Sequence, residues 1–371
     1  MSAPLCIVNP YEHGGGAEYQ ISLLIDALVQ AERYDIYYLA RFADERERTR
    51  NYRIVRIGGG GKIPRLGYSM DAAALYRALS KIRPRLIYQR VGGAYTGICA
   101  FYARRHGIPL IWHVAHDTDV ARRSLDPGRN FLRVRLEKWA LNFGVRRADC
   151  VVVQTQHQAR LLEKNFARTA DAVIPNFHPA PRELLDKSGA VTVVWIANLK
   201  PWKQPEVFAR LARSLRDCHG VNFVMVGAAA GAGANQAWQQ SLMTDIAAAP
   251  NLEYVGPKSH SEVNELLARA HIFVNTSAHE GFPNTFIQAW LRDVAVVSLN
   301  VDPDGVLDGK QVGIIAHSEP ALSQSVRRLI EDAGARAAFV RRAREHALLH
   351  HSLRNVQDLT RLIVSRGGSA G

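Results

Sequence analysis

The segment NTSAHEGFPNTFIQAW, residues 275–290, carries the residue types best suited to binding and reacting with an anionic ligand. An apolar run ends where the segment begins, the following loop holds Glu280, and Asn284 or Thr285 is expected to cap a helix. Ligands of parallel sheets bind beyond the strand ends, where open backbone amides at a helix start attract anions. Gln288 follows Asn284 by one helical turn and is expected to reach the same ligand.

A second loop of this kind is ANLKPWKQPEVF, residues 197–208. Lys200 and Lys203 precede a helix whose start is marked by Pro205 and Glu206. The lysine charge and the helix dipole are therefore expected to converge on one anion. Lys203 is the better placed of the two, whereas a solvated surface lysine is an equal alternative for Lys200.

The segment IWHVAHDTD, residues 111–119, brings two histidines and two aspartates to the end of another apolar run. Residues three apart on a strand point to opposite faces, so His113 and His116 do not converge on one metal ion. We expect a single pocket histidine, His116, with Asp117 beside it, and a hydrogen-bonded core histidine at His113. Asp117 and Asp119 also fit a manganese-binding DxD pattern, which is too short to support a metal site.

A glycine run, GGGAE, follows the first apolar segment and precedes an amphipathic stretch. Gly15 and Gly16 allow the backbone to approach a ligand closely, and a plain flexible turn is the alternative. The run matches neither GxGxxG nor GxxxxGK(S/T), which disfavours nicotinamide-binding and P-loop proteins. A second run, GGGGK at residues 58–62, lacks the following Ser or Thr and is expected to be a loop.

Together, these four segments resemble the retaining family-four glycosyltransferases with the GT-B fold. HEGFPNTFIQAW is similar to their donor-binding motif, in which two glutamates flank seven residues, and GGGAE is similar to the glycine loop of their first domain. AHD resembles their pocket histidine and LKPWKQ their phosphate-binding lysine segment, and the similarity runs from about residue 4 to residue 316. The resemblance implies an α/β fold of GT-B type, with two doubly wound Rossmann-like domains facing each other across a cleft. It also implies a retaining glycosyltransferase that moves a sugar from a nucleoside diphosphate sugar to an acceptor.

The resemblance implies a role for each matching position. Glu280 would contact the donor sugar and His116 the same sugar near its reacting carbon, so these two are the expected catalytic residues. Lys203 and the amides from Gly281 to Thr285 would hold the diphosphate, and the glycine loop would line the cleft. The expected substrate-binding residues are Gly15, Gly16, Asp117, Asn198, Lys200, Lys203, Gly281, Phe282, Pro283, Asn284, Thr285 and Gln288.

Two positions depart from the family pattern. Gln288 stands where the family has its second glutamate, so it can still form hydrogen bonds with ribose hydroxyls but carries no charge. Asn198 stands where the phosphate segment commonly has an arginine. Lys203, helped by Lys200, is then the main cation. Fixed cations and amides stabilise the charge of the leaving nucleoside diphosphate, so we expect no divalent metal and no cofactor besides the nucleotide-sugar co-substrate. The family's front-face substitution, in which the leaving phosphate helps to deprotonate the acceptor, needs no carboxylate nucleophile.

Short apolar runs alternate with amphipathic stretches along the chain, which is typical of parallel α/β sheets. A proline-rich linker places a domain boundary near residue 183, giving an acceptor-side domain over 1–183 and a nucleotide-sugar-binding domain over 184–345. A C-terminal helix within 346–371 is expected to pack back on the first domain. Strands are expected near 4–9, 35–40, 52–57, 85–89, 109–114, 149–154, 191–196, 221–226, 251–255, 271–275, 294–299 and 312–316.

The chain has 371 residues, a length that predicts two domains. Its composition, 47% hydrophobic and 22% charged residues, is typical of folded proteins. Residues 1–180 hold 27 lysines and arginines against 16 acidic residues, so most of the net charge of +13 lies there. The stripe GRNFLRVRLEKWALNFGVRR, residues 128–147, fits a helix lying on an anionic membrane or an ordinary amphipathic core helix. No nucleic-acid-binding motif accompanies the charge, so nucleic acid is not an expected partner.

The four cysteines lie far apart, and neither an export signal nor a membrane-spanning run is visible. We therefore expect a cytoplasmic protein, at most peripheral on the inner face of the cell membrane. The expected acceptor is a carbohydrate or a lipid-linked molecule, such as a polysaccharide precursor. The alternatives are another GT-B enzyme, either a nucleotide-sugar epimerase or a phosphorylase, and a non-enzymatic protein that binds an anionic surface. His346 and His350 are expected to be surface histidines, because EHALLHH lacks the metalloprotease spacing.

Overall fold

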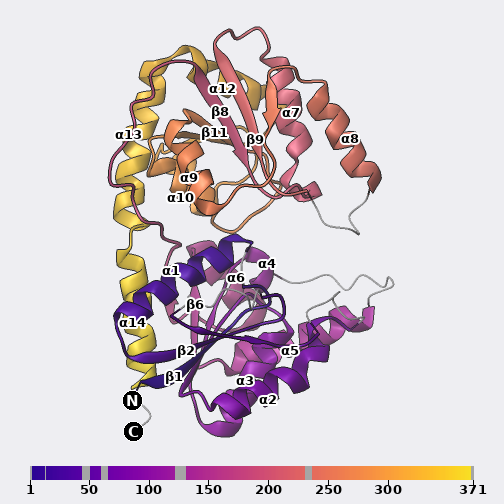
Figure 1. Cartoon of the computed structure of the whole chain (residues 1–371), viewed down its shortest axis with the longest axis vertical. Coiled ribbons are helices and arrows are strands. Elements are labelled where there is room, and N and C mark those ends of the chain that lie inside the picture. The colour runs from indigo at the N-terminus through magenta and orange to yellow at the C-terminus, as the bar shows by residue number, and fades with distance from the viewer. Residues whose placement is uncertain are drawn as a thin grey trace. The chain divides into compact units, whose positions relative to one another are not determined.

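The chain divides into two compact units in its computed structural model (Figure 1). The first unit comprises Met1–Asn176 and Leu353–Gly371, and the second comprises Phe177–Ser352. None of the described helices is both long enough and apolar enough to cross a bilayer. The structure describes residues 2–12, 14–43, 51–59, 66–121, 131–229 and 236–368.

The divisions between the units differ from the expected boundaries. The first falls before residue 183, because Phe177 is already buried and the backbone N–H of His178 donates to the carbonyl of His351 within the second unit. The second division falls after residue 345, because the helix α13 (Ala333–His350) continues through that position without a break.

A parallel sheet of seven described strands forms the centre of the first unit, in the order β3-β2-β1-β4-β5-β6-β7. Six of these strands match the expected positions to within one or two residues. The seventh, β7, has only two residues and was not predicted. The strands are β1 (Ala3–Val8), β2 (Tyr34–Ala40), β3 (Arg53–Arg56), β4 (Leu86–Arg90), β5 (Leu110–His113), β6 (Cys150–Val153) and β7 (Ala172–Val173).

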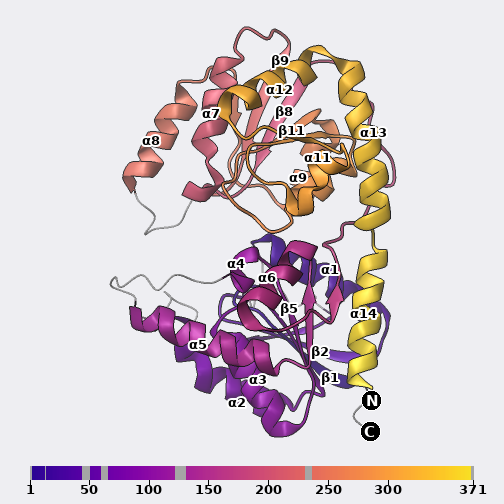
Figure 2. The same cartoon turned by 180° about the vertical axis from the view of Figure 1, so that it is seen from behind.

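Helices cover both faces of this sheet (Figure 2). Cys6, Val8 and Trp112 point into a core that the sheet shares with α2, α3 and α5, while α14 lies along α1 on the other face. The helices α3 and α5 approach closely at Gly97, because this residue has no side chain. A Cβ there would lie 2.4 Å from the carbonyl oxygen of Ala140. The helices are α1 (Gly16–Gln30), η1 (Gly67–Asp71), α2 (Ala72–Ile82), α3 (Ala94–His106), α4 (Asp117–Val120), α5 (Phe131–Arg147), α6 (Gln156–Phe166) and α14 (Arg354–Gly367).

The second unit contains a parallel sheet of six described strands, in the order β10-β9-β8-β11-β12-β13. All six were expected, and the bounds of β8 and β9 agree with the prediction at both ends. The ends of β8 and β11 lie side by side, because these strands are paired. The strands are β8 (Val191–Ile196), β9 (Val221–Val226), β10 (Leu252–Tyr254), β11 (Ile272–Asn275), β12 (Ala295–Ser298) and β13 (Ile314–Ile315).

Alternating side chains of the second sheet face two hydrophobic cores. Val193 and Trp195 of β8 face α7, α8 and α12, whereas Val194 faces α9, α10 and α13 on the opposite side. The helices of this unit, besides α13, are η2 (Pro201–Lys203), α7 (Pro205–Ser214), α8 (Gln236–Ala247), α9 (His260–Arg269), α10 (Asn284–Trp290), η3 (Pro303–Gly305), α11 (Val306–Gly309) and α12 (Glu319–Glu331).

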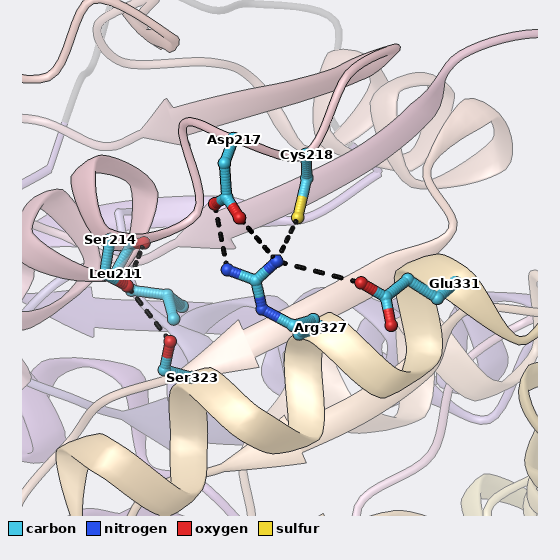
Figure 3. Close-up of polar contacts among 7 residues, drawn as sticks. All are labelled: Leu211, Ser214, Asp217, Cys218, Ser323, Arg327 and Glu331. Carbon is cyan, nitrogen blue, oxygen red and sulfur yellow. Dashed lines mark hydrogen bonds and ion pairs between the residues drawn. The ribbon is translucent and has the colours of Figure 1, made fainter.

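Polar contacts at the surface fasten α12 to the end of α7 and the loop that follows it (Figure 3). The guanidinium of Arg327 donates to both carboxylate oxygens of Asp217, at 2.8 and 2.9 Å, and to the sulfur of Cys218 at 3.3 Å. One turn earlier on α12, the hydroxyl of Ser323 lies 3.0 Å from that of Ser214. These polar contacts lie at the surface edge of the helices that cover one face of the second sheet, whose packing is otherwise apolar.

Candidate functional site

Glu280 and Lys203 form an ion pair beyond the ends of β8 and β11 in the second unit. The Oε2 atom of Glu280 lies 2.7 Å from Nζ of Lys203, and the two side chains are only 16% and 18% exposed. The other carboxylate oxygen accepts hydrogen bonds from the hydroxyl of Ser277 at 2.6 Å and from Nδ2 of Asn275 at 3.0 Å. The structure thus brings together the two charged residues on which the predicted donor site depends.

The surroundings of Glu280 keep its carboxylate ionised. Burial by itself would raise the pKa of Glu280, but the charge of Lys203 and the hydrogen bonds from Lys203, Ser277 and Asn275 outweigh it and bring the pKa below its ordinary value. An anion and a cation therefore face each other at neutral pH in a largely water-excluded place. A ligand that carries both hydroxyls and phosphates has a matching partner for each.

The other predicted residues of the lysine segment are arranged differently. The ammonium of Lys200 lies over the ring of Trp202, 4.9 Å from its centroid, a cation–π contact. Asn198 is exposed in the loop after β8. The ion pair with Glu280 is made by Lys203.

The helix that follows Glu280 begins without the expected side-chain cap. α10 starts at Asn284 and is preceded by Pro283, whose side chain has no hydrogen-bonding atom, so the prediction that Asn284 or Thr285 caps the helix was wrong. Phe282, beside Gly281 in the same loop, packs against the ring of His351 with 4.5 Å between centroids.

Gln288 is buried within α10 and reaches α9. Its Nε2 atom donates to Oδ1 of Asn264 at 2.9 Å, and its own carbonyl accepts from Arg292. Sequence reasoning missed Asn264 because the two residues belong to different helices. Asn275 and Ser277 were missed too, although their place directly after an apolar run was a usable signal.

In the first unit, His116 is exposed and precedes the short helix α4. The carboxylate of Asp119 is buried and accepts the backbone N–H groups of Ala115 at 2.9 Å and His116 at 3.1 Å. Asp117 instead accepts from Nε2 of Gln158 on α6 at 3.0 Å. The two aspartates therefore serve different partners, and no metal-binding cluster occurs among the described residues.

His113 occupies the core position expected for it. It is almost completely buried, and its Nδ1 atom lies 2.7 Å from the hydroxyl of Tyr88. Burial lowers the pKa of His113 well below its usual value, and the nearby charge of Arg90 lowers it further. His113 is therefore a neutral core residue.

A carboxylate of the same unit lies close to the backbone of the glycine loop. Gly15 directly precedes α1, and Glu18 in the first turn folds back so that a Cβ on Gly15 would lie 2.3 Å from its Oε2 atom. The other oxygen of Glu18 accepts from Nδ2 of Asn9 at 2.8 Å. Gly16 is the first residue of the helix. Of the second glycine run, residues 60–62 lie outside the described residues.

Helix α5 has one face packed in the core of the first unit and another face that is exposed. Its inner face packs on α3, and the carboxylate of Glu137 accepts the backbone N–H of Tyr68 at 3.2 Å. On its outer face, Trp139 is 68% and Leu132 57% exposed, and Trp139 stacks with Phe143 at 6.0 Å. Residues 128–130 of the stripe lie outside the described residues.

His346, expected at the surface, is half-buried. Its ring meets that of Trp290 edge to face at 5.6 Å, and burial lowers the pKa of His346 to about 4. His350, in contrast, is exposed at the end of α13. The covering ring comes from α10, so helical periodicity alone could not have revealed it.

Comparisons with known proteins agree with this architecture. The family profile described as "Glycosyl transferase 4-like domain" matches residues 12–177, and the one described as "Glycosyl transferases group 1" matches residues 190–332. A curated relative, D-inositol 3-phosphate glycosyltransferase of Stackebrandtia nassauensis, is 25% identical over 271 residues, which cover 66% of this chain. The alignment spans 60% of the length of that relative.

Three solved structures show the same fold over nearly their whole length. Sucrose-phosphate synthase from Thermosynechococcus elongatus has a TM-score of 0.76 at 16% identity and 98% coverage of both chains. HepE from Anabaena, in complex with UDP and glucose, has a TM-score of 0.75 at 18% identity, with 98% of this chain and 100% of HepE covered. WaaG, a glycosyltransferase of lipopolysaccharide biosynthesis, has a TM-score of 0.77 at 12% identity, with 99% and 100% covered. The expected GT-B fold class is confirmed.

Proposed function

Because the chain belongs to the glycosyltransferase family that combines a 4-like first domain with a group 1 second domain, we propose that it transfers a hexosyl group from a nucleoside diphosphate sugar to an acceptor, with retention of configuration. The observation that carries the proposal is the Glu280–Lys203 pair beyond the strand ends of the second unit. A nucleoside diphosphate sugar has hydroxyls for the carboxylate and phosphates for the ammonium.

In the proposed reaction, Lys203 binds the diphosphate and Glu280 accepts hydrogen bonds from hydroxyls of the donor sugar. The bond between the anomeric carbon and the phosphate oxygen breaks, and the acceptor oxygen attacks on the same face. The acceptor proton passes to the leaving phosphate. Lys203 and the backbone amides of Gly281–Thr285 stabilise the charge that develops on the leaving group, without a divalent metal. His116 is assigned to the sugar near its reacting carbon on the resemblance alone.

The donor is tested by binding. The structure of HepE that resembles this chain contains UDP and glucose, so UDP-glucose is the first probe within a panel of nucleoside diphosphates and their sugars. A specific donor raises the unfolding temperature by mass action, and its turnover releases nucleoside diphosphate. Turnover should survive EDTA and fall sharply in Lys203→Ala. If chelation abolishes turnover and manganese restores it, the metal-independent mechanism is wrong.

For the acceptor side, the proposal is a carbohydrate or lipid-linked acceptor used by a protein that lies peripherally on the inner face of the cell membrane. The support is the exposed part of α5, where Trp139 and Leu132 are exposed. Also exposed on the same helix are Arg135, Arg146 and Arg147. Glu137, the acidic residue of this helix, is turned inward, so the outer face is positively charged as well as apolar. Both properties favour an anionic bilayer, and each basic residue near such a surface adds about 1 kcal/mol.

Vesicle binding tests this surface. Binding to vesicles that contain phosphatidylserine should be strong at low ionic strength and fall at high salt, since screening weakens the attraction. It should also fall in the double variants Arg135→Gln/Lys138→Gln and Leu132→Ser/Trp139→Ser. Leu349→Ser changes a leucine of the second unit that is as exposed as Trp139; it is the matched control and should bind like the parent. Equal binding to neutral and anionic vesicles, or no binding to either, would favour a soluble acceptor.

A further inference from the structure

Thr276 follows the last residue of β11 and is completely buried. Its hydroxyl accepts a hydrogen bond from Nε1 of Trp195 at 2.8 Å. It donates to the carbonyl oxygen of Lys203 at 2.7 Å, and the carbonyl oxygen of Gln204 lies at 2.9 Å. A hydroxyl has one proton, so the two carbonyl oxygens share the hydrogen bond that Thr276 donates. The indole N–H can only donate, so it does not compete for this proton.

Besides the hydroxyl, a backbone hydrogen bond and an ion pair join the loop at 276–280 to the loop at 200–204. The backbone N–H of Ala278 donates to the carbonyl of Trp202 at 2.8 Å, and the carboxylate of Glu280 holds the ammonium of Lys203 at 2.7 Å. Alternate residues of one loop therefore meet the other. Thr276 holds the backbone of Lys203, whereas Glu280 holds its charged end.

The lysine loop needs such support because its own conformation is unfavourable. Gln204 has a φ of 50°, in the left-handed region, which costs a residue with a Cβ about 1 kcal/mol or more. Pro205 follows and begins α7 without a backbone N–H of its own. Within the turn, the backbone N–H of Lys203 donates to the carbonyl of Lys200 at 2.9 Å and that of Gln204 to the carbonyl of Pro201 at 3.1 Å. The bond from Thr276 adds a partner from outside the turn, at the carbonyl of Lys203 and shared with that of Gln204.

We infer that Thr276 is a positioning residue for the phosphate-binding lysine: its buried hydroxyl fixes the backbone of Lys203 so that the ammonium is presented beyond the strand ends. This inference rests on the proposed function, in which Lys203 holds the donor diphosphate. Thr276 itself touches neither reactant. Without the hydroxyl, two carbonyls and the indole N–H of Trp195 lose a buried partner, and the lysine loop becomes mobile.

The test compares Thr276→Val, which keeps the shape and removes the hydroxyl, with Thr276→Ser, which keeps the hydroxyl. In ligand-free protein, backbone hydrogen exchange over residues 199–206 should be faster in the valine variant and parent-like in the serine variant. The Kd for UDP should rise about tenfold in the valine variant, as expected for a lost buried hydrogen bond, and less than about twofold in the serine variant. Ser298→Ala removes another buried strand-end hydroxyl, bonded to Val301 instead, and should change neither quantity.

The two readouts separate this inference from the proposed function. Parent-like exchange in Thr276→Val overturns the inference whether or not a nucleotide binds. Faster exchange with unchanged UDP affinity also overturns it, because the hydroxyl would then stabilise the loop without serving the lysine. A parent protein that binds no nucleotide of the panel refutes the proposed function instead. If Thr276→Val does not fold, Thr276→Ala, which also removes the hydroxyl and leaves Trp195 in place, must accelerate exchange in the same segment for the inference to stand.

Discussion

The substitution Glu280→Gln tests the centre of the site most directly. The carboxylate accepts hydrogen bonds from Lys203 at 2.7 Å, Ser277 at 2.6 Å and Asn275 at 3.0 Å. An amide has a single acceptor oxygen, so the variant can satisfy Ser277 and Asn275 only by turning its NH2 group toward the ammonium of Lys203. The lost charge-assisted bond is worth about 1.5–3 kcal/mol, and we expect a loss of unfolding free energy in that range.

The same change should lower turnover without weakening the binding of UDP. Turnover of the nucleoside diphosphate sugar should fall at least about tenfold, or about 1.4 kcal/mol, because the donor sugar loses a charged acceptor. The affinity for free UDP should stay equal or increase, because Lys203 no longer has a carboxylate that competes with the phosphates. Lys203→Gln should instead weaken UDP binding.

Two assays decide the outcome. Release of nucleoside diphosphate from the donor reports turnover, and titration calorimetry with UDP reports affinity. Glu262→Gln is the matched control, since Glu262 pairs with Lys258 at 3.2 Å on the exposed surface of the same unit and should leave both quantities unchanged. Undiminished turnover in Glu280→Gln, or weaker UDP binding by that variant, would refute the assignment of Glu280 to the sugar and Lys203 to the diphosphate.

Three further predictions concern stability. Gly144→Ala should cost about 1–3 kcal/mol in chemical denaturation, because the new Cβ would lie 2.6 Å from the backbone of Thr96, whereas Gly309→Ala, which faces open space, should be nearly neutral. Burial, aided by nearby positive charge, lowers the pKa of His178 to about 4, so the folded state resists protonation of this ring. The contribution of the neutral ring to the unfolding free energy should be fully present above about pH 6.5 and be lost toward pH 4, by up to about 3 kcal/mol. His178→Gln should make the unfolding free energy depend less on pH in this range. Arg327→Met should lower the stability only slightly, and less at high salt, since the pair with Asp217 that it breaks is largely exposed. A large loss that does not depend on salt would contradict this expectation.

Much of the fold could be predicted from hydrophobic patterning alone. Strands buried on both faces of a parallel sheet are continuous apolar runs, and each expected run proved to be a strand. The pair at Ala172–Val173 escaped because two residues form no recognisable run. Glu280 and Lys203 were both identified as site residues because each follows a strand and precedes a helix, the position at which parallel sheets bind ligands.

The remainder of the site depends on contacts that no local pattern encodes. The bond between Gln288 and Asn264 joins two helices, and the bond between Thr276 and Trp195 joins two strand ends. The burial of His346 likewise depends on a ring that comes from another helix. Each of these requires knowledge of which elements are neighbours in space, which periodicity within one element does not supply.

The first unit is assembled from two stretches of chain, and this has a consequence for biosynthesis. Val356, Leu359 and Ile363 of α14 are buried in that unit, on the helix that lies along α1. A ribosome synthesises these residues only after the whole of the second unit, so α1 emerges long before its partner helix exists. The second unit, whose residues are contiguous, can complete its fold first, although its sequence starts later. Until α14 has been synthesised, the part of α1 that it covers stays exposed, and we expect a folding helper to act there on the nascent chain.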